Sequence, residues 1–158
     1  MNSFMEAMLG NWHLNGLATF HTGNPYTLRF NGCQGQWGAC RPDFITGKDP
    51  NAAPAGGRNP DHWFDTANVA KPAPLTGGNI GLQTNYAPPT RSVDMSIFKD
   101  FVFTERWKVQ FRAETFNMAN TPQFGTPDQN LQDNNFGKVT STQAGTERKF
   151  QFALRLAF

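Results

Sequence analysis

The chain has 158 residues, enough for one ordinary domain, and its 38% of hydrophobic residues is concentrated in aromatic side chains, with 15 Phe and 4 Trp. The net charge of +2 argues against a nucleic-acid-binding function, and no apolar stretch approaches the roughly 18 residues of a transmembrane helix. Gly, Pro, Asn and Thr supply much of the rest, which favours strands and loops over helices.

The first predicted strand covers residues 11–22, where apolar or small residues alternate with polar ones at the two-residue period of a β-strand. One face carries Trp12, Leu14, Gly16, Ala18 and Phe20. The other face carries Asn11, His13, Asn15, Leu17, Thr19 and His21, with Leu17 as the misfit.

A connection rich in Gly, Pro and Asn follows over residues 23–90, and loops of this length are uncommon in compact soluble domains. It contains both cysteines of the chain, Cys33 and Cys40, with six residues between them. If this loop is extracellular, we expect a disulfide that closes a small loop, and two unpaired thiols are the alternative. A zinc site is not expected, because no second Cys or His pair has suitable spacing.

Residues 91–103 and 107–117 form two further predicted strands, joined by the tight turn 104–106. In both strands the odd-numbered positions are mostly apolar and the even-numbered positions mostly polar. Lys99 on the apolar face and Phe98 on the polar face are exceptions. We expect the long side chain of Lys99 to reach the nearby end of its strand, where its amine can leave the apolar surface.

The fourth predicted strand covers residues 148–158, after a second polar and turn-rich connection. One face of it carries Phe150, Phe152, Leu154, Leu156 and Phe158, and the other carries Gln151, Ala153, Arg155 and Ala157. A transmembrane barrel strand needs about 9–11 residues, with apolar side chains outward and polar ones inward. A strand of this kind that closes on Phe is similar to the C-terminal assembly signal of bacterial outer-membrane barrels.

The connections predict short turns at one end of the strands and long loops at the other. If the strands run alternately up and down, four aromatic residues reach the short-turn end: Trp12, Phe103, Trp107 and Phe158. An interfacial aromatic girdle requires this placement. The sequence therefore predicts an all-β fold in the outer membrane, an antiparallel transmembrane β-barrel fragment. It has about four long strands, short periplasmic turns and long extracellular loops, with its apolar faces on lipid.

The charged residues of these strands gather on the polar face: Asp94, Asp100, Arg112, Glu114 and Arg155. A substrate path is one interpretation, but we favour charge pairing against a plug and neighbouring strands, since a wet lumen tolerates ions. Residues 128–135 resemble a calcium loop but lack the Gly and the terminal Glu of an EF-hand, so we expect a solvated turn. No nucleophile–base pair or phosphate loop stands out, so we expect neither an enzyme nor a bound metal or cofactor.

Several stretches, in this order and spacing, carry a family resemblance. They are Leu9–Gly16, His21–Thr27, Arg41–Asp43, Trp63–Ala67, Ser92–Asp100, Phe111–Gly125, Phe136–Thr142 and the final strand. Together they resemble the C-terminal part of the barrel of TonB-dependent outer-membrane receptors, especially the Oar-like type. In that type a carboxypeptidase-regulatory-like domain precedes the plug.

The resemblance implies a receptor barrel of about 22 strands, of which residues 1–158 supply the last four and the assembly signal. By this resemblance, we expect the plug, the TonB box and the signal sequence of such a receptor to lie outside residues 1–158. The implied function is energy-coupled uptake of a scarce nutrient. The implied partners are outer-membrane lipid, the rest of the barrel and plug, the barrel-assembly machinery, and the TonB system through the missing N-terminal part. A small soluble β-sheet binding module, lectin-like in kind, is the alternative.

Overall fold

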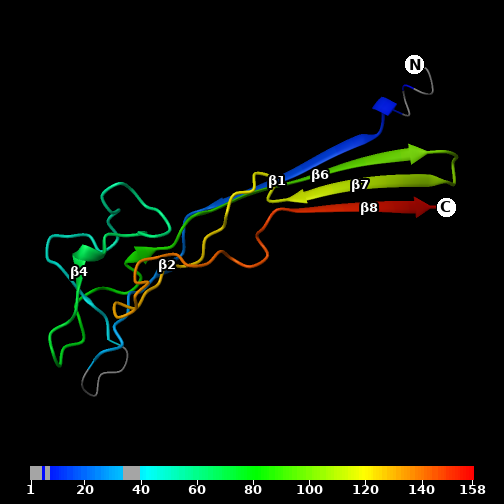
Figure 1. Cartoon of the computed structure of the whole chain (residues 1–158). Coiled ribbons are helices and arrows are strands. Elements are labelled where there is room, and N and C mark those ends of the chain that lie inside the picture. The colour runs from blue at the N-terminus through cyan, green and yellow to red at the C-terminus, as the bar shows by residue number, and fades with distance from the viewer. Residues whose placement is uncertain (1–4, 6–7, 34–39) are drawn as a thin grey trace. The chain divides into compact units, whose positions relative to one another are not determined.

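The computed structural model describes residue 5 and residues 8–33 and 40–158 (Figure 1). Its elements are β1 (Trp12–His21), β2 (Pro25–Tyr26), β3 (Asp43–Phe44), the 3₁₀-helix η1 (Thr66–Asn68), β4 (Val69–Ala70), β5 (Asn85–Tyr86), β6 (Thr90–Val102), β7 (Lys108–Phe116) and β8 (Lys149–Ala157). The predicted all-β class is confirmed. In these described ranges, no helix is long and apolar enough to cross a membrane.

The four long strands form one sheet in the order β1-β6-β7-β8, and the ends of each lie within one residue of the predicted range. The β6–β7 and β7–β8 pairs are antiparallel and joined in a continuous register. Among the described residues, β1 and β8 have a strand partner on one side only. The sheet is therefore open at two edges, and this chain does not close a barrel by itself.

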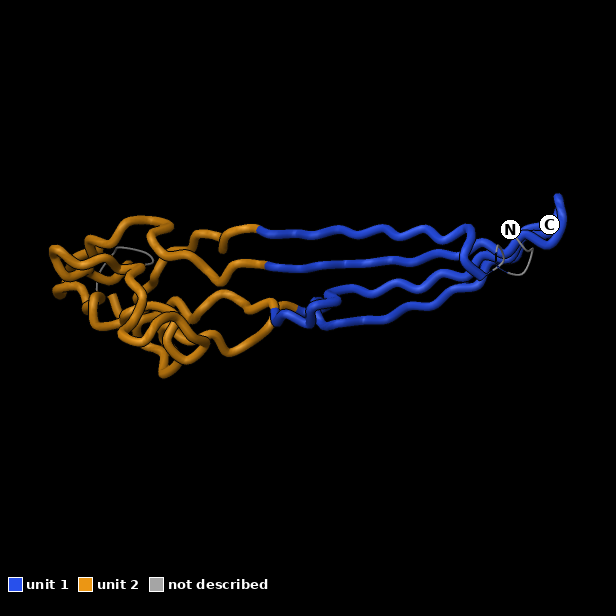
Figure 2. The backbone as a smooth tube through the Cα atoms, turned by 90° about the horizontal axis from the view of Figure 1, so that it is seen from above, with its two compact units in different colours: residues 1–20, 91–122, 144–158 blue, residues 21–90, 123–143 orange. Residues whose placement is uncertain are grey.

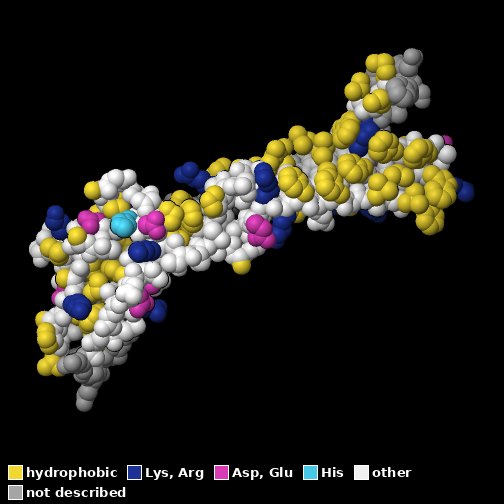
Figure 3. Space-filling view, in the orientation of Figure 1, with side chains coloured by type: hydrophobic (Ala, Val, Ile, Leu, Met, Phe, Trp, Pro, Cys, Tyr) yellow, Lys and Arg dark blue, Asp and Glu magenta, His cyan; other side chains and the backbone are white. Residues whose placement is uncertain are grey.

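The register places residues of one kind in rows across the sheet. On the apolar face, Ile97 lies opposite Ala113, which lies opposite Phe152. On the polar face, Asp100 lies opposite Gln110, which lies opposite Arg155. Because side chains alternate between faces with period two, the sequence pattern and this register agree along the whole hairpin. Within the described ranges the apolar face is left uncovered, and hydrophobic side chains gather over these strands in Figure 3.

The chain forms two compact units, which Figure 2 distinguishes by colour. The first consists of residues 1–20, 91–122 and 144–158 and contains the long sheet. The second consists of residues 21–90 and 123–143. The chain leaves the long sheet after β1 and β7 and re-enters it before β6 and β8, so both connections begin and end at the same end of the sheet.

The second unit differs from the expectation that residues 23–90 form a structureless loop. It has a hydrophobic core of five buried side chains: Tyr26, Leu28, Phe64, Val69 and Ile80. Phe64 meets Phe136 edge to face, with ring centroids 5.3 Å apart. The short pairs β2–β5 and β3–β4 complete the unit. These core residues are far apart in sequence and follow no period, which is why periodicity did not reveal them.

Side-chain amides and carboxylates replace regular ladders in this second unit. Asn79 is hydrogen-bonded to β3 twice: Asn79 N donates to Asp43 Oδ1 at 2.7 Å, and Phe44 N donates to Asn79 Oδ1 at 2.8 Å. Asn85 is fully buried, and its Nδ2 donates to Pro50 O at 2.8 Å. Such bonds satisfy buried backbone groups where the chain is irregular.

Burial raises the pKa of Tyr26 above its usual value, and the nearby charge of Arg58 offsets this only in part.

Candidate functional site

The polar face of the long sheet centres on Asp100. Gln110 Nε2 donates to Asp100 Oδ1 at 2.8 Å, and His13 Nε2 lies 3.7 Å from Asp100 Oδ2. These groups come from β6, β7 and β1, so one carboxylate connects three strands. Arg155 of β8 occupies the same row, opposite Gln110. The arrangement is a hydrogen-bonded polar surface rather than a set of isolated charges.

A second group on this face contains the residue that broke the predicted pattern, Phe98. The guanidinium of Arg112 lies over the Phe98 ring, 4.3 Å from its centroid, and Phe98 is only 9% exposed. Arg112 Nε also lies 3.5 Å from Glu114 Oε1. A guanidinium over an aromatic face is attracted by the ring quadrupole, so Arg112 covers an aromatic ring that the strand alternation places on the polar face.

A pocket of about 190 Å³ opens on the polar face between β1, β6 and β7, and Asn15, Leu17 and Asp94 are among its lining residues. Asp94 Oδ1 accepts hydrogen bonds from Ser92 Oγ at 3.2 Å and from Asn117 N at 2.8 Å. This carboxylate therefore fixes the end of β7. In the ranges that the structure describes, no three His, Cys, Asp or Glu side chains gather to hold a metal ion.

The four aromatic residues assigned to a girdle all lie at the turn end of the long sheet. Trp12 begins β1, Phe103 and Trp107 flank the tight turn, and Phe158 follows β8. The rings of Trp107 and Phe158 stack with centroids 5.5 Å apart. Phe103 N donates to Trp107 O at 3.1 Å, which closes the turn. The structure thus brings together residues that are scattered in the sequence.

Lys99 differs from its prediction. The side chain is 4% exposed, and Nζ donates to Met8 O at 3.2 Å and to Gly10 O at 2.8 Å. It also lies 4.6 Å from the ring centroid of Trp12 and 5.2 Å from that of Phe101. The ammonium group therefore ends on backbone carbonyls and aromatic rings instead of in water. The two carbonyls belong to the segment before β1, and the strand pattern carries no signal for them.

The residues assigned to an assembly signal lie on β8 or directly after it. Phe150, Phe152, Leu154, Leu156 and Phe158 are between 52% and 86% exposed. The register with β7 places the first four on the apolar face. The other edge of β8 is unpaired among the described residues, and such an edge is a template for another strand.

The two cysteines lie in the second unit and are joined as a disulfide, with Cα atoms 6.0 Å apart. Phe30 N donates to Cys40 O at 2.9 Å, which connects the cystine loop to the core segment. The residues inside that loop, 34–39, lie outside the described ranges.

The segment 128–135, compared with a calcium loop, is held by its own side chains. Asp128 Oδ1 accepts from Asn130 N at 3.0 Å, and Asp133 Oδ1 accepts from Asn130 Nδ2 at 2.8 Å. These carboxylates stabilise turns, as Asp side chains commonly do.

A family model described as an outer membrane beta barrel domain matches residues 1–151. The match includes β1, β6 and β7 completely and the first residues of β8. No curated protein and no solved structure matches the chain.

Proposed function

This chain belongs to the family of outer membrane β-barrel domains, and from that premise we propose that it is the C-terminal barrel segment of a TonB-dependent receptor. The protein is located in the outer membrane, and its fold is a fragment of an antiparallel transmembrane β-barrel. In the proposal, β1, β6, β7 and β8 are the last strands of the receptor barrel. The order and spacing of the stretches from Leu9 to Thr142 support the assignment to this receptor class.

One observation carries the proposal: the long sheet has an exposed apolar face and a hydrogen-bonded charged face. Leu14 and Leu154 are 65% and 73% exposed on the first face, where lipid would cover them. Asp100 and Arg112 lie on the second face, where water and a plug would meet them. A membrane barrel needs this division, because charges on its lipid side cost about 2–4 kcal/mol each at the midplane.

The open edges require the rest of a barrel. Backbone groups left unpaired in hydrocarbon cost several kcal/mol each, so β1 and β8 need strand partners within the membrane. In the proposal the preceding part of the receptor supplies them, and the barrel-assembly machinery recognises β8 as it inserts. The second unit, with its core and its disulfide, forms the extracellular loops.

The proposed role is energy-coupled uptake. The intact receptor binds a nutrient at its outer face, and the TonB system acts on a plug that lies against the charged face of these strands. We propose no catalytic step, no cofactor and no metal for this segment. The paired groups around Asp100 and Arg112 serve as the lumen wall.

A soluble lectin-like module is the second candidate, and the separate core of the second unit is the observation in its favour. The long sheet argues against it. Large side chains such as Phe20 and Phe152 are each 68% exposed, and the described residues provide nothing that covers them. Contiguous apolar patches of this kind mark membrane or protein contacts in native proteins.

The reading frame upstream of Met1, together with fractionation of the expressed product, tests the proposal. A continuous frame that encodes a plug and a TonB box, with the product in the outer membrane, is the expected result. A frame that joins this barrel segment to other sequences, without a plug, would overturn the receptor assignment while leaving the barrel family unchanged.

A further inference from the structure

The chain contains two Asn-Gly pairs, Asn15–Gly16 and Asn31–Gly32, and all four residues are exposed. The first pair lies within β1, whereas the second lies outside the strands of the second unit, where the chain bends at Asn31. An asparagine followed by glycine can react with its own backbone, because glycine has no side chain to shield its nitrogen. The two pairs therefore have the same chemistry in different structural settings.

We propose that Asn31 is a self-modification site, and that its conversion to isoaspartate releases Phe30 from Cys40. The backbone nitrogen of Gly32 attacks Cγ of Asn31, the new N–C bond closes a succinimide ring, and the Cγ–Nδ2 bond breaks. Nδ2 leaves as ammonia with the proton of the Gly32 nitrogen. Water then hydrolyses one carbonyl–nitrogen bond of the ring, which gives aspartate or isoaspartate. The reaction consumes only water, so it does not depend on the proposed receptor function.

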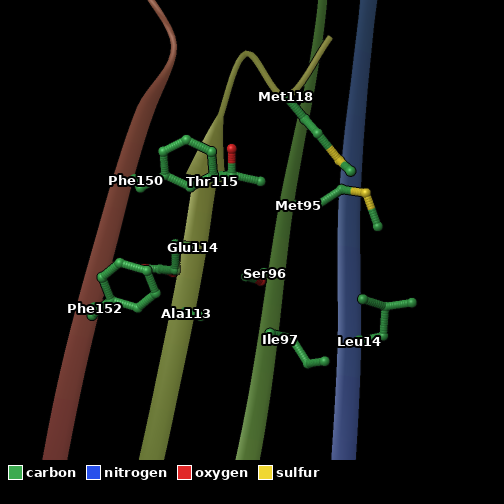
Figure 4. A pocket seen from close by; sticks show the side chains of 10 residues that line it. All are labelled: Leu14, Met95, Ser96, Ile97, Ala113, Glu114, Thr115, Met118, Phe150 and Phe152. Carbon is green, nitrogen blue, oxygen red and sulfur yellow. The ribbon is translucent and has the colours of Figure 1, made fainter.

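Local structure favours this reaction at Asn31 over Asn15. Attack requires the asparagine backbone to rotate until the next nitrogen approaches Cγ, and a strand that is paired in a sheet resists this rotation. β1 is paired with β6, and Leu14, directly before Asn15, lines a groove together with Met95 and Ile97 of β6 (Figure 4). Asn15 can therefore react only when β1 opens locally.

Packing keeps a glycine at position 32. A Cβ atom there would lie 2.7 Å from Phe30 Cζ and 2.5 Å from Gln132 Nε2. The amide of Gln132 can turn away, but Phe30 is only 8% exposed, so its ring has little freedom to move. The nitrogen that follows Asn31 thus stays unhindered, and a test of the site must change Asn31 rather than Gly32.

The product alters a small closed ring of the chain. Phe30 N donates to Cys40 O at 2.9 Å, and the disulfide joins Cys40 to Cys33. The ring runs from Phe30 through Asn31 and Gly32 to Cys33, across the disulfide, and back through this hydrogen bond. Isoaspartate routes the backbone through its own Cβ and so adds one atom to the ring. The hydrogen bond is the weakest link, because a single bond of this kind contributes little net stability, and it is the link that opens.

The purified full-length protein tests the site. It is aged at neutral pH in heavy-oxygen water and digested in ordinary water, so that only conversion during ageing places heavy oxygen in the product. Peptide mass spectrometry should show conversion at Asn31 at least about tenfold faster than at Asn15, since β1 must open first. In the urea-denatured chain the two rates should be similar, which makes Asn15 the matched control. Equal rates in the folded protein, or faster conversion at Asn15, would overturn the site.

Hydrogen exchange at the Phe30 amide tests the release, in fresh and aged protein with the disulfide intact. Exchange should be about fivefold faster in molecules that contain isoaspartate, as the loss of one hydrogen bond implies. Asn31→Gln keeps an exposed amide but needs a larger ring for the same attack, so the aged variant should exchange like the fresh wild type. Unchanged protection of Phe30 in converted wild-type protein would overturn the release. Neither measurement involves insertion into a membrane, so failure here leaves the proposed function untouched.

Discussion

Leu154 and Ala153 are neighbours in β8 whose side chains lie on opposite faces of the long sheet. Leu154→Arg places a charge on the proposed lipid side and should lower the free energy of unfolding by about 2–4 kcal/mol. Ala153→Arg faces the lumen opposite Arg112, where like charges cost about 0.2–1 kcal/mol. Urea titration of the full-length receptor, folded into vesicles, measures both values. Equal losses for the two variants would contradict the assignment of faces.

At the scale of an element, the start of β1 depends on one side chain from β6. Lys99→Met keeps the length of the side chain but removes the donors to Met8 O and Gly10 O. Hydrogen bonds to charged groups contribute about 1.5–3 kcal/mol, so the segment before β1 should open at least tenfold more often. Hydrogen exchange of residues 8–12 measures this opening.

Lys99→Arg is the control for that experiment, because it keeps a charged donor near Trp12 and Phe101. The arginine variant should protect the segment nearly as well as the wild type. Slow exchange in Lys99→Met would mean that the two carbonyls have other donors and that the lysine does not hold the segment.

Strand β8 ends at the stacked pair of Trp107 and Phe158. Deletion of Phe158 removes this pair, which is worth about 0.5–1.5 kcal/mol, so refolding in detergent should remain normal. If the assembly machinery recognises the alternating face of β8, the same deletion should strongly reduce insertion in cells, since an extended peptide is recognised through its alternate side chains. Quantitative blotting of outer-membrane fractions measures insertion.

Phe103→Ala is the matched control for the deletion, because it removes an aromatic residue at the same end of the sheet without changing β8. Its insertion should be close to that of the wild type. Normal insertion of the Phe158 deletion would leave this residue with a role in the aromatic rim alone.

At the scale of the whole molecule, the disulfide acts on the second unit. For a loop of this length, the chain-entropy account gives about 2–3 kcal/mol of stabilisation. In intact cells, Cys33 and Cys40 should resist alkylation until a reductant is added, and reduction should increase hydrogen exchange around Phe30 while the long strands stay protected. Mass spectrometry of the alkylated peptides gives the result. Thiols that react without a reductant would contradict it.

The sequence alone was sufficient to predict features that depend on residues close together along the chain. The four long strands were predicted to within one residue, because each carries its full apolar face in one uninterrupted segment. The core of the second unit was not predicted, since Leu28 and Phe64 meet across many residues with no period. The partners of Lys99 and Phe98 were missed for the same reason, because they lie on other segments.

The second unit is built from the connection between β1 and β6 and from the connection between β7 and β8. Within it, Arg29 N donates to Gln129 O at 2.8 Å, and Trp63 N donates to Gly137 O at 2.9 Å. Backbone hydrogen bonds therefore join the two connections. The β6–β7 turn at Glu105 is therefore a second link between two parts of the chain that these hydrogen bonds already join. A receptor whose backbone is cut at Glu105 should therefore keep its two pieces associated. The two pieces, when produced separately, should assemble into one receptor.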